Sequence, residues 1–508
     1  MRKIFSLALS GLCLCLSIAT WGQSYSEEAL IFSRINPGGS ARIQAMGGSQ
    51  VALGGDYSSA FSNPAGLGFF NRSEATLSLG TNFYNSKSSY LGNSTNDSKS
   101  NFNIPGFSIV FHSDKNKGKL VSGNFAISFV RTNNFNQNFA YQGTNSNNSL
   151  IDYFVSQSNG ATPGQFSQTG NAYYSLSRLA YNNYLIGPVS EVIPNGDSTQ
   201  YHTYANQIPV QHERVQVTGA QNQFNLSYGL NFNDFFYLGG TVGFPSFNYQ
   251  SQKSYTETFA SGPLFGFNLN ENYSIKGSGI NTTLGAIIKP MDFVQLGFSI
   301  ATPTYFYSVA DNYNAMLTSG WNNYSFIDAT HPSHNTVLNG VRDSISQLIA
   351  NYSLVTPWRI KAGATFFIKK RGLITAEVEK VNYSKSSLSS QTTGLDFTQD
   401  NASIKSLYGN VFNIRLGGEY RFGNFRGRLG YSYMPDPYIA IQNKTDNFIT
   451  SFSGGIGYRT DQFFIDLGVI QTQWNSSYRP YTLNPVSSPV VILKNSNFSA
   501  MITVGYNL

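Results

Sequence analysis

The chain has 508 residues, of which 12% are charged and 15% aromatic, with a formal net charge of +7 at pH 7. The charged fraction is about half that usual in soluble domains, and a mean hydropathy of −0.22 excludes a bundle of membrane-spanning helices. The positive charge is spread along the chain without a Lys/Arg cluster, so nothing indicates nucleic-acid binding, and lumen charges or attraction to anionic lipid are the favoured explanations.

The N-terminus predicts a signal peptide over residues 1–22. A basic start (residues 1–3) precedes an apolar run (residues 4–19), and Gly22-Gln23 offers a plausible cleavage site. Both cysteines, Cys13 and Cys15, lie in this leader, so the mature chain is expected to have no thiol or disulfide chemistry. An exported chain with no second apolar run is either secreted or an outer-membrane barrel.

Residues 23–72 form a distinct segment, rich in Gly, Ala and Ser. Small residues allow close packing of the backbone, and Asn63-Pro64 followed by Gly66 favours a fixed turn. We therefore predict a compact plug, or hatch, that fills the lumen of a barrel formed by residues 73–508.

Strict alternation then predicts strands. Within 413–421, Ile414, Leu416 and Tyr420 share one face, and Arg415 and Glu419 share the other. An apolar face opposite a charged, Gly-rich face is typical of a barrel wall with lipid outside and a polar lumen. The pattern yields an all-β fold, a 14-stranded antiparallel transmembrane β-barrel, with strands near 73–84, 103–113, 119–131, 211–232, 235–258, 270–290, 293–308, 356–369, 372–388, 408–421, 425–438, 447–459, 462–477 and 495–508.

Short and long connections alternate along the chain, which places short turns in the periplasm and long loops outside. Two long extracellular loops are predicted, at 132–210 and 309–355, with helical spacing of apolar residues in 173–181 and 341–349. Such helices suit either an apolar landing surface for a ligand or a simple cap on the barrel, and the sequence favours neither.

The alternation also directs a group of charged residues into the lumen. Opposite charges on adjacent strands pair well, and each would be costly on the lipid face. A ladder of ion pairs that braces the wall and the hatch is the favoured interpretation; contact with a ligand carboxylate is the alternative. The predicted lumenal ladder comprises Arg359, Lys361, Glu377, Glu379, Arg415, Glu419, Arg426 and Arg428.

No catalytic constellation, phosphate loop or His/Cys metal cluster is recognisable, so we expect neither an enzyme nor a resident cofactor or metal. His331 and His334 could ligate metal or haem iron, although solvated loop histidines are the favoured interpretation.

The hatch segment resembles that of the FadL/TodX family of outer-membrane channels for hydrophobic compounds. The likeness rests on the run from Gly47-Gly48 to Asp56, on Asn63-Pro64-Ala65-Gly66-Leu67, and on weaker matches at 302–304, 356–359, 430–433 and 457–459. The resemblance implies passive uptake of long-chain fatty acids or aromatic hydrocarbons, with a lateral exit through a gap beside a kinked third strand. In this chain the expected break is Gly123-Asn124.

The expected function is therefore a monomeric outer-membrane channel, surrounded by lipid, that carries a hydrophobic small-molecule ligand. A haem-binding uptake protein and a structural or secretion-associated barrel that binds a protein partner are the alternatives.

Overall fold

The computed structural model describes residues 25–166, 175–189, 199–204, 207–326, 336–369, 371–440, 446–483 and 489–508. The predicted signal peptide and the two histidines at 331 and 334 lie outside the described residues. Among the helices within these ranges, none combines the length and the apolar character needed to cross a membrane.

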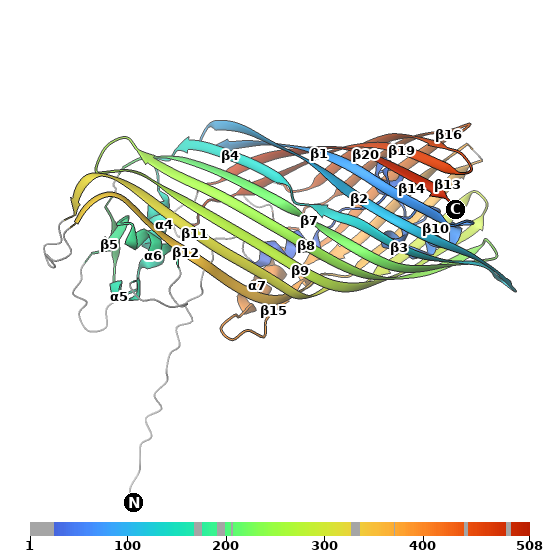
Figure 1. Cartoon of the computed structure of the whole chain (residues 1–508), viewed down its shortest axis with the longest axis horizontal. Helices are drawn as coiled ribbons and strands as arrows, with labels where there is room; N and C mark the ends of the chain where they lie inside the picture. The colour runs from blue at the N-terminus through green and yellow to red at the C-terminus, as the bar shows by residue number, and fades with distance from the viewer. Residues whose placement is uncertain are drawn as a thin grey trace, which may run out of the picture.

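Long antiparallel strands form a closed barrel that runs the length of the molecule (Figure 1). The described residues contain fourteen wall strands, as predicted, and the ring closes where β1 (Glu74–Tyr90) pairs with β20 (Val491–Asn507). Several wall strands consist of two pieces. In chain order the others are β2 (Asn93–Lys117), β3 (Leu120–Asn134) with β4 (Gln137–Thr144), β7 (Pro209–Phe232), β8 (Phe236–Phe259), β9 (Leu264–Met291), β10 (Val294–Ala301) with β11 (Tyr305–Phe326), β12 (Thr336–Val355) with β13 (Arg359–Ile368), β14 (Gly372–Asn382), β16 (Asn410–Phe422), β17 (Phe425–Met434), β18 (Ile449–Arg459) and β19 (Phe463–Tyr478).

The predicted alternation is present in the wall. On β16 the side chains of Ile414, Leu416 and Tyr420 are exposed on the outer face, and those of Arg415 and Glu419 are buried in the lumen. The outer apolar residues form a belt around the barrel, which is the surface that lipid tails require. Further members of the belt are Leu77, Ile109, Phe125, Leu226, Val242, Leu284, Phe298, Ile374, Leu467 and Val504.

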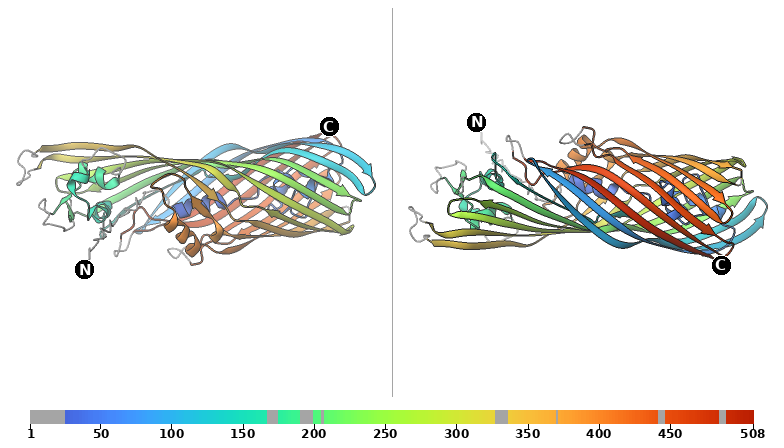
Figure 2. Two further views of the ribbon diagram at one scale, coloured as in Figure 1. Left: turned by 90° about the horizontal axis from the view of Figure 1, so that it is seen from below. Right: turned by 90° about the horizontal axis from the view of Figure 1, so that it is seen from above.

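The N-terminal segment, drawn in blue, lies within the ring of strands (Figure 2). It contains four short helical elements within the described residues. The elements are α1 (Tyr25–Ser33), α2 (Ala41–Ala45), α3 (Ser59–Ser62) and η1 (Pro64–Phe69). Helix α2 packs on β17 to β20, and η1 packs on β7 to β9, which lie across the ring. The segment therefore bridges two opposite arcs of the wall.

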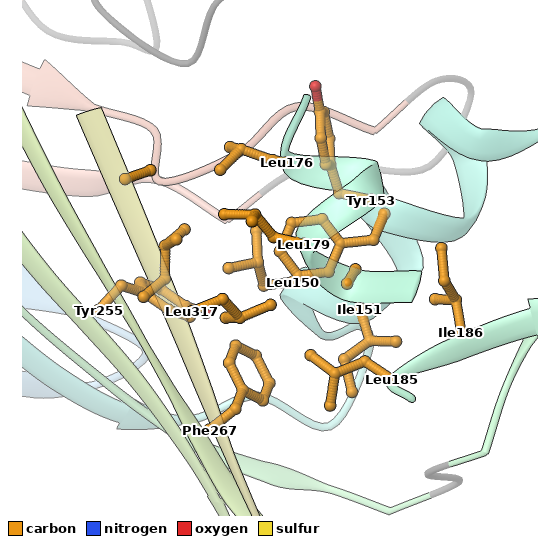
Figure 3. Packing of buried hydrophobic residues seen from close by; sticks show 14 of the residues in the cluster. Leu150, Ile151, Tyr153, Leu176, Leu179, Leu185, Ile186, Tyr255, Phe267 and Leu317 are labelled. Atoms are coloured by element: carbon orange, nitrogen blue, oxygen red, sulfur yellow. The ribbon is translucent and has the colours of Figure 1, made fainter. Parts of the chain in front are cut away.

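One end of the barrel, the loop end, carries a small helical layer. It contains α4 (Leu150–Ser158), α5 (Pro163–Phe166), α6 (Leu176–Asn182) and the short pair β5 (Ile186–Pro188) and β6 (Tyr201–Thr203). Figure 3 shows Leu150, Leu179 and Leu185 beside Phe267 and Leu317 of the wall. These helices pack on each other and on the extended wall, so most of their apolar surface is buried.

Residues 309–355 were predicted to form an extracellular loop, and this prediction is wrong. Residues 305–326 and 336–355 form β11 and β12, which pair with each other, and the predicted helix at 341–349 is strand. The predicted loop at 132–210 begins with β4, which pairs with β7, before the helical layer starts. A second insertion, with η4 (Tyr383–Lys385), β15 (Ser387–Ser389) and α7 (Thr398–Leu407), lies between β14 and β16.

Candidate functional site: a lumenal cavity and a seam in the wall

The residues of the predicted hatch motif fix the shape of the N-terminal segment. Asp56 accepts hydrogen bonds from the Oγ of Ser40 (2.7 Å) and from the backbone N–H of Ser58 (3.0 Å). Asn63 donates to Val51 O at 2.6 Å and to Ala286 O of β9 at 3.3 Å. Its Oδ1 also accepts the N–H of Ala65, which starts the η1 turn directly after Pro64. These contacts explain why the segment needs short polar side chains at fixed positions.

Glycines allow the segment to touch the wall backbone. Gly47 and Gly48 both have positive φ, and a side chain at Gly47 would meet the carbonyl oxygens of Leu416 and Tyr431. Gly430 on β17 is the wall counterpart, since a methyl group there would overlap the backbone of Gly47. Gly66 allows close packing within the segment itself, since a side chain there would meet Leu53 O.

The first group of lumenal charges is centred on two buried glutamates of β14. Arg415 contacts Glu377 and Glu379 with its two terminal nitrogens, each at 2.7 Å, and Arg359 contacts Glu379 at 3.1 Å. The second oxygen of Glu377 accepts the backbone N–H groups of Gln50 and Val51, both at 2.9 Å. A wall carboxylate therefore binds the N-terminal segment directly.

The remaining residues of this group also reach the N-terminal segment. Arg359 donates to Ser33 O. Lys361 lies 3.9 Å from Glu379 and places its Nζ 5.5 Å from the ring centre of Phe61. These contacts favour the bracing interpretation, because the cations already have partners in the wall and in the segment.

The second group is centred on Glu419 of β16. Its carboxylate contacts Arg428 at 2.9 Å, Arg421 at 2.8 Å and Arg42 of the N-terminal segment at 3.3 Å. Arg428 also pairs with Asp466 at 2.6 Å. The ladder predicted from the sequence does not include Arg42 or Asp466. The signal for Asp466 was its place on the polar face of an alternating strand, and Arg42 is the one cation within the small-residue core at 37–68.

Arg426 does not join the ladder, contrary to the prediction. Its guanidinium donates to Gly423 O and Phe425 O of its own turn, and it makes no ion pair within the described residues. The reason is its place one residue from the turn, where nearby carbonyls are better placed than the lumenal carboxylates.

A cavity of about 910 Å³ lies above the N-terminal segment, towards the loop end. Its floor includes residues 36–39 and Gly47, and one side is the face of α1 that carries Glu27, Leu30 and Ile31, together with Arg34 directly after the helix. The wall contributes both apolar and amide side chains. Among these are Phe135, Phe139, Trp474, Leu493, Asn82 and Asn103.

The opposite face of α1 is fixed to the wall. Phe32 stacks on Phe247 with ring centres 3.9 Å apart, and Glu28 accepts hydrogen bonds from the hydroxyls of Tyr352 (2.8 Å) and Tyr273. Burial raises the pKa of Glu28 to about 8, against the opposing effect of the two tyrosine hydrogen bonds, and the nearby Asp311 adds to the increase. The carboxyl group of Glu28 is therefore largely protonated at neutral pH.

The wall has a seam where β2 and β3 separate. Their pairing extends from Lys117↔Leu120 only as far as Gly106↔Val130. Beyond that point β2 pairs with β1 and β4 pairs with β7, with no ladder between β2 and β4 in the described residues. We call this unpaired line, between residues 93–105 and 131–144, the wall seam.

Local sequence explains the seam. Pro105 has no N–H to donate, and the β1–β2 register shifts by one residue beside it, between Ser78 and Gly80. On the other side, Phe135 and Asn136 interrupt the third wall strand. Both edges of the seam line the cavity, through Pro105 and Asn103 on one side and 131–137 on the other.

The predicted break at Gly123-Asn124 is wrong. Gly123 and Asn124 pair continuously with β2 on one side and with β7 on the other. Gly123 gives room to the hydroxyl of Tyr228, and the Asn124 side chain donates to Leu67 O and Phe70 O at 2.7 and 3.1 Å. These residues hold the N-terminal segment and do not open the wall.

Within the described residues, contacts that involve side chains span the seam in place of a ladder. Asn134 donates to Asn101 Oδ1 of the opposite edge at 3.4 Å, and Lys99 reaches past the edge to Val217 O of β7 at 2.9 Å. Arg214 lies 3.5 Å from Asp97 further along. A line of polar side-chain contacts is weaker than a backbone ladder, so the wall is held less firmly here than along continuously paired strands such as β18 and β19.

No family model matches the chain, and no curated protein sequence matches it either. Solved structures do. A FadL homologue from Pseudomonas aeruginosa is similar at 13% identity with a TM-score of 0.55, covering 93% of this chain and 99% of that one. The toluene transporter TbuX from Ralstonia pickettii is similar at 13% identity with a TM-score of 0.51 and the same coverage. The chain thus has the fold of these FadL-type and TbuX-type barrels.

Proposed function

We propose that this protein is an outer-membrane channel of the Gram-negative type, acting as a monomer, that takes up hydrophobic small molecules and releases them sideways into lipid. The observation that carries the proposal is the continuity of the cavity with the wall seam. The apolar belt, the shared fold and the predicted export signal support it.

A lateral route follows from solvation. Below the cavity, the N-terminal segment is held across the lumen by Glu377, Glu419 and the close backbone contact at Gly430, so we propose that it is a closed hatch. For a hydrophobic ligand that continued along an aqueous lumen, exposure to water would cost about 0.8 kcal/mol of free energy for each CH₂ group. Passage from the cavity into the lipid tails avoids that loss.

The test is to lock the seam. The mature chain is expected to lack cysteine, so Asn101→Cys with Asn134→Cys places a single thiol pair across the seam. Uptake of a labelled long-chain fatty acid and of an aromatic hydrocarbon would be measured in a host that lacks its own uptake protein. Oxidation should abolish uptake, and reduction should restore it.

The matched control is Thr365→Cys with Thr375→Cys, whose hydroxyls lie 3.0 Å apart on the continuously paired strands β13 and β14, outside the cavity lining. Oxidation of this pair should leave uptake unchanged. Uptake that continues with the seam locked would overturn the lateral route. A barrel that takes up neither compound in any state would favour a scaffold that binds a protein partner.

A further inference from the structure

We infer that Arg131 is a specificity-determining residue at the lipid-facing mouth of the wall seam, where it selects amphiphiles with an anionic head group over alcohols and hydrocarbons. The inference rests on the proposed function and names the class of cargo that the seam accepts.

The position of Arg131 follows from the alternation of β3. Phe125, Ile127 and Phe129 lie on its outer face, and Phe129 stacks on Phe107 of β2 with ring centres 5.3 Å apart. Val130, which faces the lumen, makes the last pair with β2. Arg131 is therefore the first outward residue beyond the paired part of the wall, directly above the apolar belt.

The guanidinium stands at the junction of the cavity and the outer surface. Arg131 lines the cavity, and its Nε donates to Asn222 Oδ1 of β7 at 3.2 Å. Tyr84 of β1, which lies across the seam, is close enough to interact with it electrostatically. Within the described residues its two terminal nitrogens donate no hydrogen bond, so they can bind a second group.

Arg34 lines the same cavity, but its guanidinium already donates hydrogen bonds to the protein. It donates to the carbonyl oxygens of Met434, Pro435 and Asn447. Arg34 therefore anchors the end of α1 to the segment that follows β17, whereas Arg131 keeps donors available at the exit.

The other seam residues suit a polar head group. Asn103, Asn133, Asn134 and Asn136 present carboxamides, and the two edges contribute no carboxylate to the cavity lining in the described residues. An amphiphile can pass with its tail entering the belt beside Phe129 while its head group stays level with Arg131. A guanidinium binds a carboxylate with two parallel charge-assisted hydrogen bonds, which an alcohol or a hydrocarbon cannot form.

The experiment compares a long-chain acid, the alcohol of the same chain length and an aromatic hydrocarbon on the full-length protein in lipid vesicles. Arg131→Gln should lower transfer of the acid relative to the alcohol by about tenfold, and Arg131→Lys should restore part of the preference. Lys276→Gln, an exposed cation on β9 away from the seam, is the matched control and should change nothing.

Unchanged alcohol transfer also shows that the Gln variant is folded. Lowering the pH until the acid is neutral should remove the preference in the wild type and leave Arg131→Gln unaffected. An equal loss for acid and alcohol, or a loss seen only in vesicles with anionic lipid, would mean that Arg131 is a lipid anchor and overturn the inference. A wild type that transfers no compound would refute the proposed function instead.

Discussion

Glu377 and Arg415 form an ion pair 2.7 Å long between adjacent wall strands, and the same carboxylate binds the backbone of the N-terminal segment at Gln50 and Val51. Glu377 therefore connects the wall to the N-terminal segment. Both oxygens of this buried carboxylate are therefore occupied, one by a guanidinium of the wall and the other by two backbone N–H groups. Through this contact the N-terminal segment shares the buried ion-pair network of the barrel.

Glu377→Gln should loosen the hatch without removing the wall. The amide retains the size of the side chain, but its nitrogen cannot accept an N–H, so one set of contacts is lost at a cost of ~1–3 kcal/mol. We expect more frequent openings in planar-bilayer current recordings. Asp396→Asn, an exposed carboxylate before α7, is the control and should behave as the wild type. Currents that match the wild type for both variants would show that Glu377 does not hold the N-terminal segment in place.

Arg428 and Arg426 provide a matched pair on one strand. Arg428→Gln removes the buried ion pair with Asp466 and one partner of Glu419, and the uncompensated charges should cost ~3–5 kcal/mol. Arg426→Gln removes contacts with turn carbonyls only and should change stability by less than about 0.5 kcal/mol. Denaturant titration followed by tryptophan fluorescence gives the free energy of unfolding of each variant, and the two values are compared with that of the wild type. Equal effects would contradict the different environments that we describe.

Substitutions of two glycines on β17 test the contact between the N-terminal segment and the wall. A methyl group at Gly430 would overlap Gly47, whereas one at Gly427 would meet nothing within 4 Å. Gly430→Ala should therefore cost ~1–3 kcal/mol by overpacking and expose the N-terminal segment to added protease. Gly427→Ala should remain resistant. Protection of the Gly430 variant would show that the segment can shift at little cost.

The docking of α1 should weaken as the pH rises. The pKa of Glu28 is about 8 in the fold and ~4.3 in a solvated chain, so the folded state binds the proton more tightly. This contribution is complete below about pH 4, decreases as the pH rises and is lost above about pH 8. Alkylation of Ala29→Cys, a fully buried site on α1, reports undocking when normalised to an exposed Thr398→Cys.

Normalised alkylation should increase between pH 6 and pH 9, a range chosen around the pKa of about 8. Addition of Glu28→Gln should abolish the increase, because an amide keeps both tyrosine contacts possible without ionising. An increase that persists in the double variant would assign the pH dependence to another group.

The sequence predicted the wall well where lipid enforces the pattern. Strands such as β16 alternate strictly because every second residue touches either lipid tails or the polar lumen. Beyond the belt that constraint ends. The outer halves of β11 and β12 meet water on one face, and the spacing of Ile345, Leu348 and Ile349 there imitates a helix. Their pairing depends on contacts with β9 that no local pattern encodes.

The position of the break in the wall was predicted wrongly for a different reason. The prediction relied on Gly123 as a weak point of the strand, but a glycine can still donate and accept backbone hydrogen bonds, and Gly123 pairs with both neighbouring strands. Pro105 cannot donate, so it was the more reliable signal. The charge ladder was largely predictable because inward positions follow from alternation. Arg42 was not, since its partner is distant in sequence.

The N-terminal segment also meets the strands that close the ring. Ala41 N donates to Thr503 Oγ1 of β20 at 2.8 Å, and Ser78 of β1 lies 2.7 Å from the same hydroxyl and 3.0 Å from the Tyr57 hydroxyl. The first and last wall strands therefore pair against the N-terminal segment, which is synthesised before either strand. We therefore expect the segment to be in place before β1 and β20 pair, and defects in it to appear as barrels that remain incompletely closed during insertion.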